Sequence, residues 1–313
     1  MEGIFEQLDR LYAAGEPEAI ETYLNEALRA FEAEDKTDRP QYISLLNELG
    51  GFLRGVSRFP EAVEVYARAL TALDALGAAD GRPYASILMN VAGLHRLTGE
   101  LARSMELFLR AKDILERMDP RDDYAYASAL NNLSLCYQET REFELARELA
   151  AHALEIMRGG AGTEHEIATA LNNLATVQMR LGAFDAAERL AAEALALYDA
   201  MPEENVHHAA ALTTYATVRF LRKEYAPALE AYTRALALTE RFFGKNLEYV
   251  YTRRNLAAVC EAIGDIPAAL RHYAEATELA ARIFGAAHER VAEYRAELAR
   301  LEALLDSGAA PPS

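Results

Sequence analysis

The sequence lacks the features that mark several large classes of protein. Its 313 residues include no tryptophan and two cysteines, Cys136 and Cys260, which are too few for a disulfide framework and indicate a reduced, cytoplasmic chain. No run approaches the roughly 18 uncharged apolar residues that suggest a membrane span. The first residues, MEGIFEQLDRLY, carry neither the positive charge nor the apolar stretch of a secretory signal. We therefore expect no association with a membrane.

Basic residues are also scarce, with 32 Lys and Arg against 49 Asp and Glu and a net charge of −17. Nucleic-acid binding depends on Lys and Arg that neutralise phosphates, so this balance argues against a nucleic-acid partner. The same argument applies to anionic membrane surfaces. An acidic exterior instead favours basic or neutral partners.

What the sequence does have is an internal repeat. LNNLS at residues 130–134 and LNNLA at 171–175 lie 41 residues apart. Related blocks follow at similar spacing in both directions, namely LNELG at 46–50, MNVAG at 89–93, TTYAT at 213–217 and RNLAA at 254–258. Self-similarity at one period predicts a repeat architecture rather than separate globular domains.

Two columns of small residues recur in the same register. One column consists of Ala27, Ala69, Ala111, Ala153, Ala194, Ala235 and Ala276, and the other of Ala62, Ser104, Ala146, Ala187, Ala228 and Ala269. Small side chains allow two helices to approach closely, where a larger residue would overfill the contact. A single helix pair cannot bury its apolar face, so the units are expected to stack side by side.

Each unit has the pattern of two helices joined by a tight turn. Apolar residues in Ile167–Leu181 follow the spacing of an amphipathic helix, and Gly182 ends that pattern. A second periodic run follows at Phe184–Met201, and no strand pattern occurs anywhere, so the fold is expected to be all-α. Where other units have glycine in the turn, three have Ser57, Arg141 or Lys223, and strain is expected there.

The combined pattern, LNNLA followed by Gly-x-Phe-x-x-Ala and Ala-Leu-x-Leu, resembles the tetratricopeptide repeat (TPR). The 41–42-residue period and the Asn-Asn pair resemble the kinesin-light-chain subclass most. The resemblance implies a right-handed TPR superhelix, an α-solenoid of about seven helix pairs with a C-terminal capping helix. We expect one solenoid over residues 1–306, with a degenerate first pair at 2–33, six clear repeats at 40–284 and the capping helix at 287–306. Residues 307–313 are expected to be a disordered tail.

In this family the first helix of each pair lines a concave face that binds extended peptides. Carried over to this sequence, the resemblance implies that the partner-binding residues are Asn90, Asn131, Asn132, Asn172, Asn173, Thr214, Arg254 and Asn255, with Arg96 and Gln138 one to two turns further on. An asparagine amide has donors and an acceptor, so it can hold both N–H and C=O of a peptide backbone. The alternative is that these asparagines bond neighbouring turns and stabilise repeat packing.

Catalytic and metal-binding patterns are weak. Glu164-His165-Glu166 contains possible metal ligands, but acidic residues are common where helices begin. Buried free cysteines usually act as small apolar residues. We expect no catalytic residue, no metal and no cofactor, and a non-enzymatic scaffold for a protein or peptide partner. The alternative is a bacterial peptide-sensing regulator whose superhelix changes pitch when a ligand binds.

Overall fold

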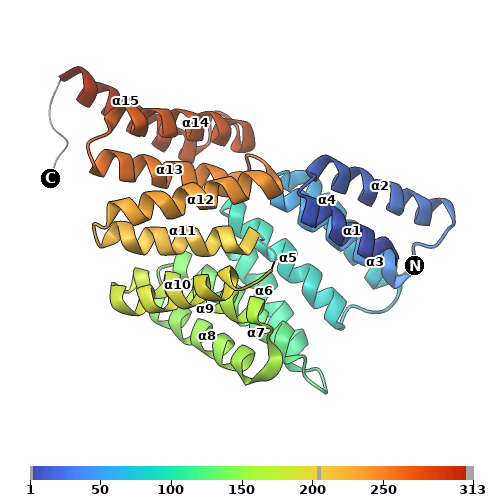
Figure 1. Ribbon diagram of the computed structural model, residues 1–313. Helices are drawn as coiled ribbons and strands as arrows, with labels where there is room; N and C mark the ends of the chain where they lie inside the picture. Colours follow the sequence, from blue (N-terminus) through green and yellow to red (C-terminus); the bar gives the residue numbers. More distant parts are fainter. Residues whose placement is uncertain (1–2, 203–205, 308–313) are drawn as a thin grey trace. The chain divides into compact units, whose positions relative to one another are not determined.

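The computed structural model describes residues 3–202 and 206–307, and helices are the only regular structure in that part of the chain (Figure 1). The α-helices are α1 (Gly3–Ala14), α2 (Pro17–Ala33), α3 (Pro40–Gly55), α4 (Phe59–Ala75), α5 (Arg82–Thr98), α6 (Leu101–Glu116), α7 (Asp123–Glu139), α8 (Phe143–Ile156), α9 (Glu164–Arg180), α10 (Phe184–Asp199), α11 (Val206–Leu221), α12 (Tyr225–Phe243), α13 (Leu247–Ala262), α14 (Ile266–Phe284) and α15 (Glu289–Ser307). A π-helical turn, η1 (Met157–Ala161), extends α8. The predicted all-α class is confirmed, with seven successive helix pairs and a final helix.

The chain divides into two compact units, Met1–Leu197 and Tyr198–Ser313. Within each unit a helix packs on the other helix of its hairpin, as α5 does on α6 and α13 on α14. The second helix of a hairpin then packs on the first helix of the next, as in α6 with α7 and α12 with α13. First helices of successive hairpins also contact one another: α3 with α5, α5 with α7, α7 with α9, and α11 with α13. This neighbour-by-neighbour pattern is that of an α-solenoid.

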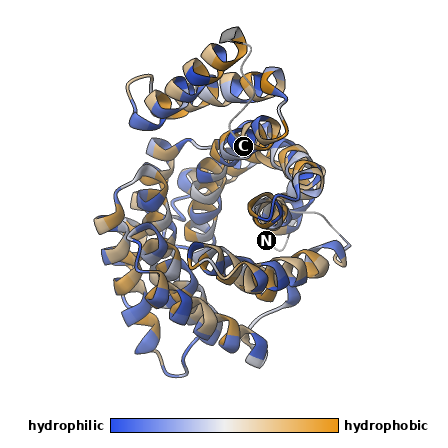
Figure 2. Ribbon diagram, turned by 90° about the vertical axis from the view of Figure 1, so that its left-hand side faces the viewer, coloured by the Kyte–Doolittle hydropathy of each residue, from blue (hydrophilic) through white to orange (hydrophobic). Residues whose placement is uncertain are grey.

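Local signals in the sequence set where the helices begin. The Asp122 carboxylate accepts a hydrogen bond from the backbone N–H of Ala125 at 2.9 Å and so caps α7. Proline occupies the first turn of α2, α3, α4, α5 and α14, where its missing N–H costs least. Apolar and polar residues are interspersed along each helix, as amphipathic helices require (Figure 2).

The turns between paired helices adopt a left-handed backbone, whether or not they contain glycine. Gly99 has φ 88°, and the non-glycine residues at the same repeat position, Ser57, Arg141 and Lys223, have φ of 64°, 66° and 63°. This conformation costs an L-residue roughly 1–2 kcal/mol, so the expected strain at these three turns is confirmed.

The two columns of small residues lie on the second helix of each pair. Every member of the column that begins at Ala62 is fully buried, and so is every member of the other column from Ala69 onward. Ala27, in the degenerate first pair, is half-buried. The structure adds a third small column, on the first helices, which sequence analysis did not single out: Gly50, Ala92, Ser134, Ala175, Ala216 and Ala257, all buried.

At the C-terminal end, Ser307, which was expected in the tail, is the last residue of a helix. The last helix, expected at 287–306, is α15 and ends at Ser307. Of the tail expected at 307–313, residues 308–313 lie outside the described residues.

Helix approach at Gly50 provides a direct test of the small columns. A Cβ added to Gly50 would lie 2.6 Å from ring carbons of Tyr66, whereas one added to Gly51 would lie 3.8 Å from the Tyr66 hydroxyl. Gly50→Ala should therefore lower the free energy of unfolding by about 1–3 kcal/mol through overpacking. Gly51→Ala is the matched control and should raise it by up to about 1 kcal/mol, because alanine favours a helix interior. Urea unfolding measures both, and equal effects of the two changes would contradict the close approach.

Candidate functional site

Three asparagines occupy one repeat position on neighbouring first helices of the N-terminal unit. Asn90 lies in α5, Asn132 in α7 and Asn173 in α9, and each side chain is half-buried. Since α5 contacts α7 and α7 contacts α9, these residues form a row across adjacent helices. We call Asn90, Asn132 and Asn173 the Asn row.

The side-chain amides of the Asn row differ in the hydrogen bonds that they make within the protein. The Asn90 Nδ2 group donates to Asn47 Oδ1 at 2.8 Å, which links α5 to α3. The Asn132 Nδ2 group donates to the backbone carbonyl of Ser128 at 2.9 Å. The Asn173 amide makes no hydrogen bond to any residue in the described part of the chain. The row therefore keeps free hydrogen-bonding capacity, which is equal at Asn90 and Asn132 and greatest at Asn173.

The first asparagine of each Asn-Asn pair has a different environment. Asn131 and Asn172 are only 6% and 9% exposed. Their Oδ1 atoms are buried and accept no hydrogen bond from the residues that the structure describes. Because they are covered, these two side chains pack between helices rather than present a surface.

The C-terminal unit carries three further candidates. Thr214 in α11 is buried, with 6% of its surface exposed. In α13, Arg254 is exposed and Asn255 is half-buried. Asn255 holds the same repeat position in its unit as the Asn row does in the N-terminal unit.

The position that corresponds to the Asn row in α3 is Glu48, which is half-buried. Burial raises the pKa of Glu48, and the carboxylate of Asp9 in α1 raises it further. Burial also raises the pKa of Tyr12 in α1, with Glu48 as the next cause. Asp9 and Tyr12 of α1 thus lie close enough to Glu48 for their charges to interact.

Glu48 should make stability depend on pH. Its pKa is higher in the folded than in the unfolded chain, so it contributes stability below the unfolded pKa and loses that contribution as the pH rises through the folded pKa. Glu48→Gln should therefore be more stable than wild type at pH 7, by a margin that shrinks as the pH falls toward 4. Urea unfolding at both pH values measures the margin, and Glu26→Gln, at an exposed site, controls for net charge. A margin that is the same at pH 7 and pH 4 would contradict this assignment.

Three arginines converge where α5, α7 and α9 end. A cavity of about 440 Å³ there is lined by Arg96, Leu135, Gln138, Glu139, Arg141, Phe143 and Arg180. We call this cavity the arginine pocket. The structure thereby brings together two predicted site residues, Arg96 and Gln138, and adds Arg141 and Arg180, which the sequence analysis missed as site residues. One signal was available: Arg180 follows Asn173 by two helical turns and so lies on the same helix face.

Hydrogen bonds within the arginine pocket are incomplete. Arg96 Nη1 donates to Glu139 Oε1 at 2.7 Å, so one of the three guanidinium groups has a carboxylate partner. The Thr176 hydroxyl donates to Gln138 Oε1 at 3.1 Å and links α9 to α7. The Gln138 Nε2 group is buried and has no acceptor among the described residues.

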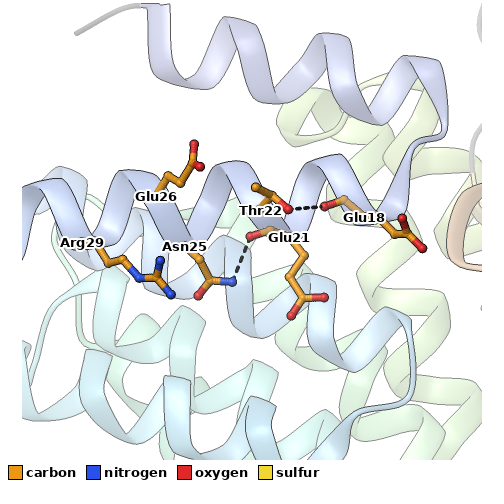
Figure 3. Close-up of a pocket in the computed structure, with 6 residues that line it drawn as sticks. All are labelled: Glu18, Glu21, Thr22, Asn25, Glu26 and Arg29. Carbon is orange, nitrogen blue, oxygen red and sulfur yellow. Dashed lines mark hydrogen bonds between the residues drawn. The ribbon is translucent and has the colours of Figure 1, made fainter.

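A second hollow, also of about 440 Å³, runs beside α2 and has the opposite character. Figure 3 shows three carboxylates there, Glu18, Glu21 and Glu26, beside a single cation, Arg29. The bonds that it contains, from Thr22 and Asn25 to carbonyls one turn earlier, are ordinary bonds within one helix. This hollow is an acidic helix surface.

The weak metal pattern at residues 164–166 has a structural use. Glu166 and Thr163 form a reciprocal capping box that begins α9. Across residues 3–202 and 206–307, no cluster of three or more His, Cys, Asp or Glu side chains is placed to hold a metal. Both free cysteines are buried, and burial raises the pKa of the Cys136 thiol. None of the helices in the described ranges has the length and hydropathy needed to cross a membrane.

Sequence comparison identifies the repeat. The tetratricopeptide repeat family matches residues 83–159, 124–200 and 207–281, which together make up more than half of the chain. The chain therefore belongs to the tetratricopeptide repeat family, and the predicted resemblance is confirmed. A search of curated proteins found no match.

Solved structures share the fold at low sequence identity. BtubC (BKLC) from P. vanneervenii is 21% identical, with a TM-score of 0.51, over 74% of this chain and 92% of that one. A tetratricopeptide repeat protein from Parabacteroides merdae is 18% identical, with a TM-score of 0.52, over 96% and 98% of the two chains. A Rap protein complexed with Competence and Sporulation Factor is 16% identical, with a TM-score of 0.58, over 98% of both chains.

Proposed function

We propose that this protein is a non-enzymatic scaffold that holds an extended peptide segment of a partner against the Asn row. The observation that carries the proposal is the free hydrogen-bonding capacity of Asn132 and Asn173, at one repeat position of two helices in contact. A half-buried amide with an open acceptor and open donors suits a peptide backbone, which offers the complementary groups. Membership of a repeat family that generally mediates protein–protein interaction supports the same function.

The spacing of the Asn row suits an extended chain. Packed helices lie about 8–10 Å apart, and an extended chain advances about 3.3 Å per residue. One amide of the row would therefore meet roughly every third residue of a peptide that crosses the helices. Binding of this kind reads the main chain, and the side chains between contact points determine selectivity.

The charge of the chain sets a preference among partners. A net charge of −17 attracts basic segments, tolerates neutral ones and opposes nucleic acid and anionic membranes. The proposal includes a cytoplasmic location, which the free thiols of Cys136 and Cys260 support.

A second candidate function is a peptide-sensing regulator whose superhelix changes pitch on binding. The chain is similar, over 98% of both chains, to a Rap protein complexed with Competence and Sporulation Factor. That similarity supports the second candidate function. Small-angle X-ray scattering with and without a bound peptide separates the two functions. A scaffold keeps its radius of gyration, whereas a sensor changes it.

Peptide binding should depend on the Asn row. A peptide array identifies a binding sequence, and fluorescence anisotropy then measures its affinity for Asn132→Ala and Asn173→Ala. Each change should weaken binding about 2- to 10-fold, because a net hydrogen bond contributes about 0.5–1.5 kcal/mol. Asn173→Ala should change the free energy of unfolding by less than about 0.5 kcal/mol, since that amide has no partner to lose.

The control is Asn25→Ala in α2, which removes an asparagine amide bonded only to the Glu21 carbonyl one turn earlier. It should leave peptide affinity unchanged. If Asn132→Ala and Asn173→Ala bind the peptide as tightly as wild type does, the Asn row is not the binding surface. If either change costs several kcal/mol of stability, its asparagine stabilises repeat packing instead.

A further inference from the structure

We infer that the arginine pocket takes the carboxylate of an acidic side chain on the bound peptide. This inference rests on the proposed function and adds one charged contact to it. The ligand group is a carboxylate held by guanidinium groups and one amide.

The pocket has more donors than the protein itself can satisfy. Arg141 and Arg180 make no ion pair with any residue in the ranges that the structure describes. Arg96 forms an ion pair with Glu139, which is the one carboxylate in the pocket lining. The lining therefore has a net charge of about +2 in a chain whose total is −17. The buried Nε2 group of Gln138 also lacks an acceptor. Guanidinium groups match a carboxylate in geometry and in charge, so an anion supplies what this site lacks.

A role in offsetting helix dipoles does not explain the arrangement. Arg96 and Arg180 lie in the last turns of α5 and α9, where cations are favourable. That role does not require the arginines to line one cavity. Arg141 also lies outside α7, in a turn where other repeats have glycine.

The pocket lies further along the same helices as the Asn row. Arg180 follows Asn173 by seven residues, and Glu139 follows Asn132 by the same number, so each pair shares a helix face. Seven residues of α-helix span about 10 Å, which is about three residues of extended peptide. A peptide that crosses the Asn row and then turns along α9 for about three residues is able to place a Glu or Asp side chain in the pocket.

A local basic pocket is compatible with the acidic chain. The net charge of −17 acts on an approaching partner at long range, whereas a contact inside the pocket acts over a few ångströms and is screened less by salt. A partner segment that suits both the acidic chain and the basic pocket is neutral or basic overall and carries one acidic residue.

The test uses the pentapeptide Ala-Ala-Glu-Ala-Ala, acetylated and amidated, beside its Gln twin. Titration into ¹⁵N-labelled full-length protein is followed by NMR at the side-chain N–H signals of the pocket arginines and of Gln138. The Glu peptide should shift these signals and bind about tenfold or more tightly than the twin, as expected for hydrogen bonds to a charged group. Arg141→Gly and Arg180→Gln should each remove most of that difference.

The matched control is Lys223→Gly. It makes the same backbone change as Arg141→Gly, at the same repeat position, and also removes one positive charge, but it lies outside the pocket. Binding of the Glu peptide to Lys223→Gly should equal that of wild type. An equal loss in both glycine variants would show that the effect is one of turn geometry or net charge and would overturn the inference.

Other outcomes separate this inference from the proposed function. If the Glu and Gln peptides bind equally and Asn173→Ala weakens both, the carboxylate site is overturned. The Asn row is then still supported as the peptide-binding surface. A parallel titration with inorganic phosphate distinguishes the source of the anion. Shifts of the pocket signals by phosphate but by neither peptide would assign the pocket to a free anion, and the absence of any shift overturns the site altogether.

Discussion

The whole structure depends on how closely the two helices of each hairpin approach. That distance is set where small residues face the partner helix, as Gly50 does against the ring of Tyr66. Between hairpins, the Ser104 hydroxyl of α6 lies 3.3 Å from the Cys136 thiol of α7, so a small residue also allows neighbouring hairpins to approach closely. Because these points pack closely in the same way, successive hairpins have nearly the same geometry. Equivalent residues of α5, α7 and α9 therefore lie on neighbouring helices. The Asn row follows from that regularity.

The fold could be predicted almost completely from the sequence because it repeats. Columns of small residues in one register indicated helix pairs, and the turn positions of Ser57, Arg141 and Lys223 followed from the glycines that replace them elsewhere. The role of Glu166 was less predictable, because the segment that contains it also fitted a metal-binding interpretation. In the structure Glu166 caps α9 together with Thr163. The spacing Thr-x-x-Glu carried that signal, and it is local enough to be read from sequence.

The candidate site was less predictable, for two physical reasons. Consecutive helical residues point about 100° apart, so Asn172 is buried whereas its neighbour Asn173 is half-exposed, although the two are chemically identical. Which of them faces outward depends on how the hairpins pack. The arginine pocket is harder still, because Arg96, Arg141 and Arg180 come from separate repeats and hold no common repeat position. Their convergence exists only in three dimensions.

Contacts restricted to adjacent hairpins also determine how the molecule comes apart. Because each hairpin packs on its immediate neighbours, the opening of one hairpin removes contacts from the adjacent hairpins and leaves the more distant ones packed. Local opening is therefore expected to spread from hairpin to hairpin rather than to involve the whole chain at once.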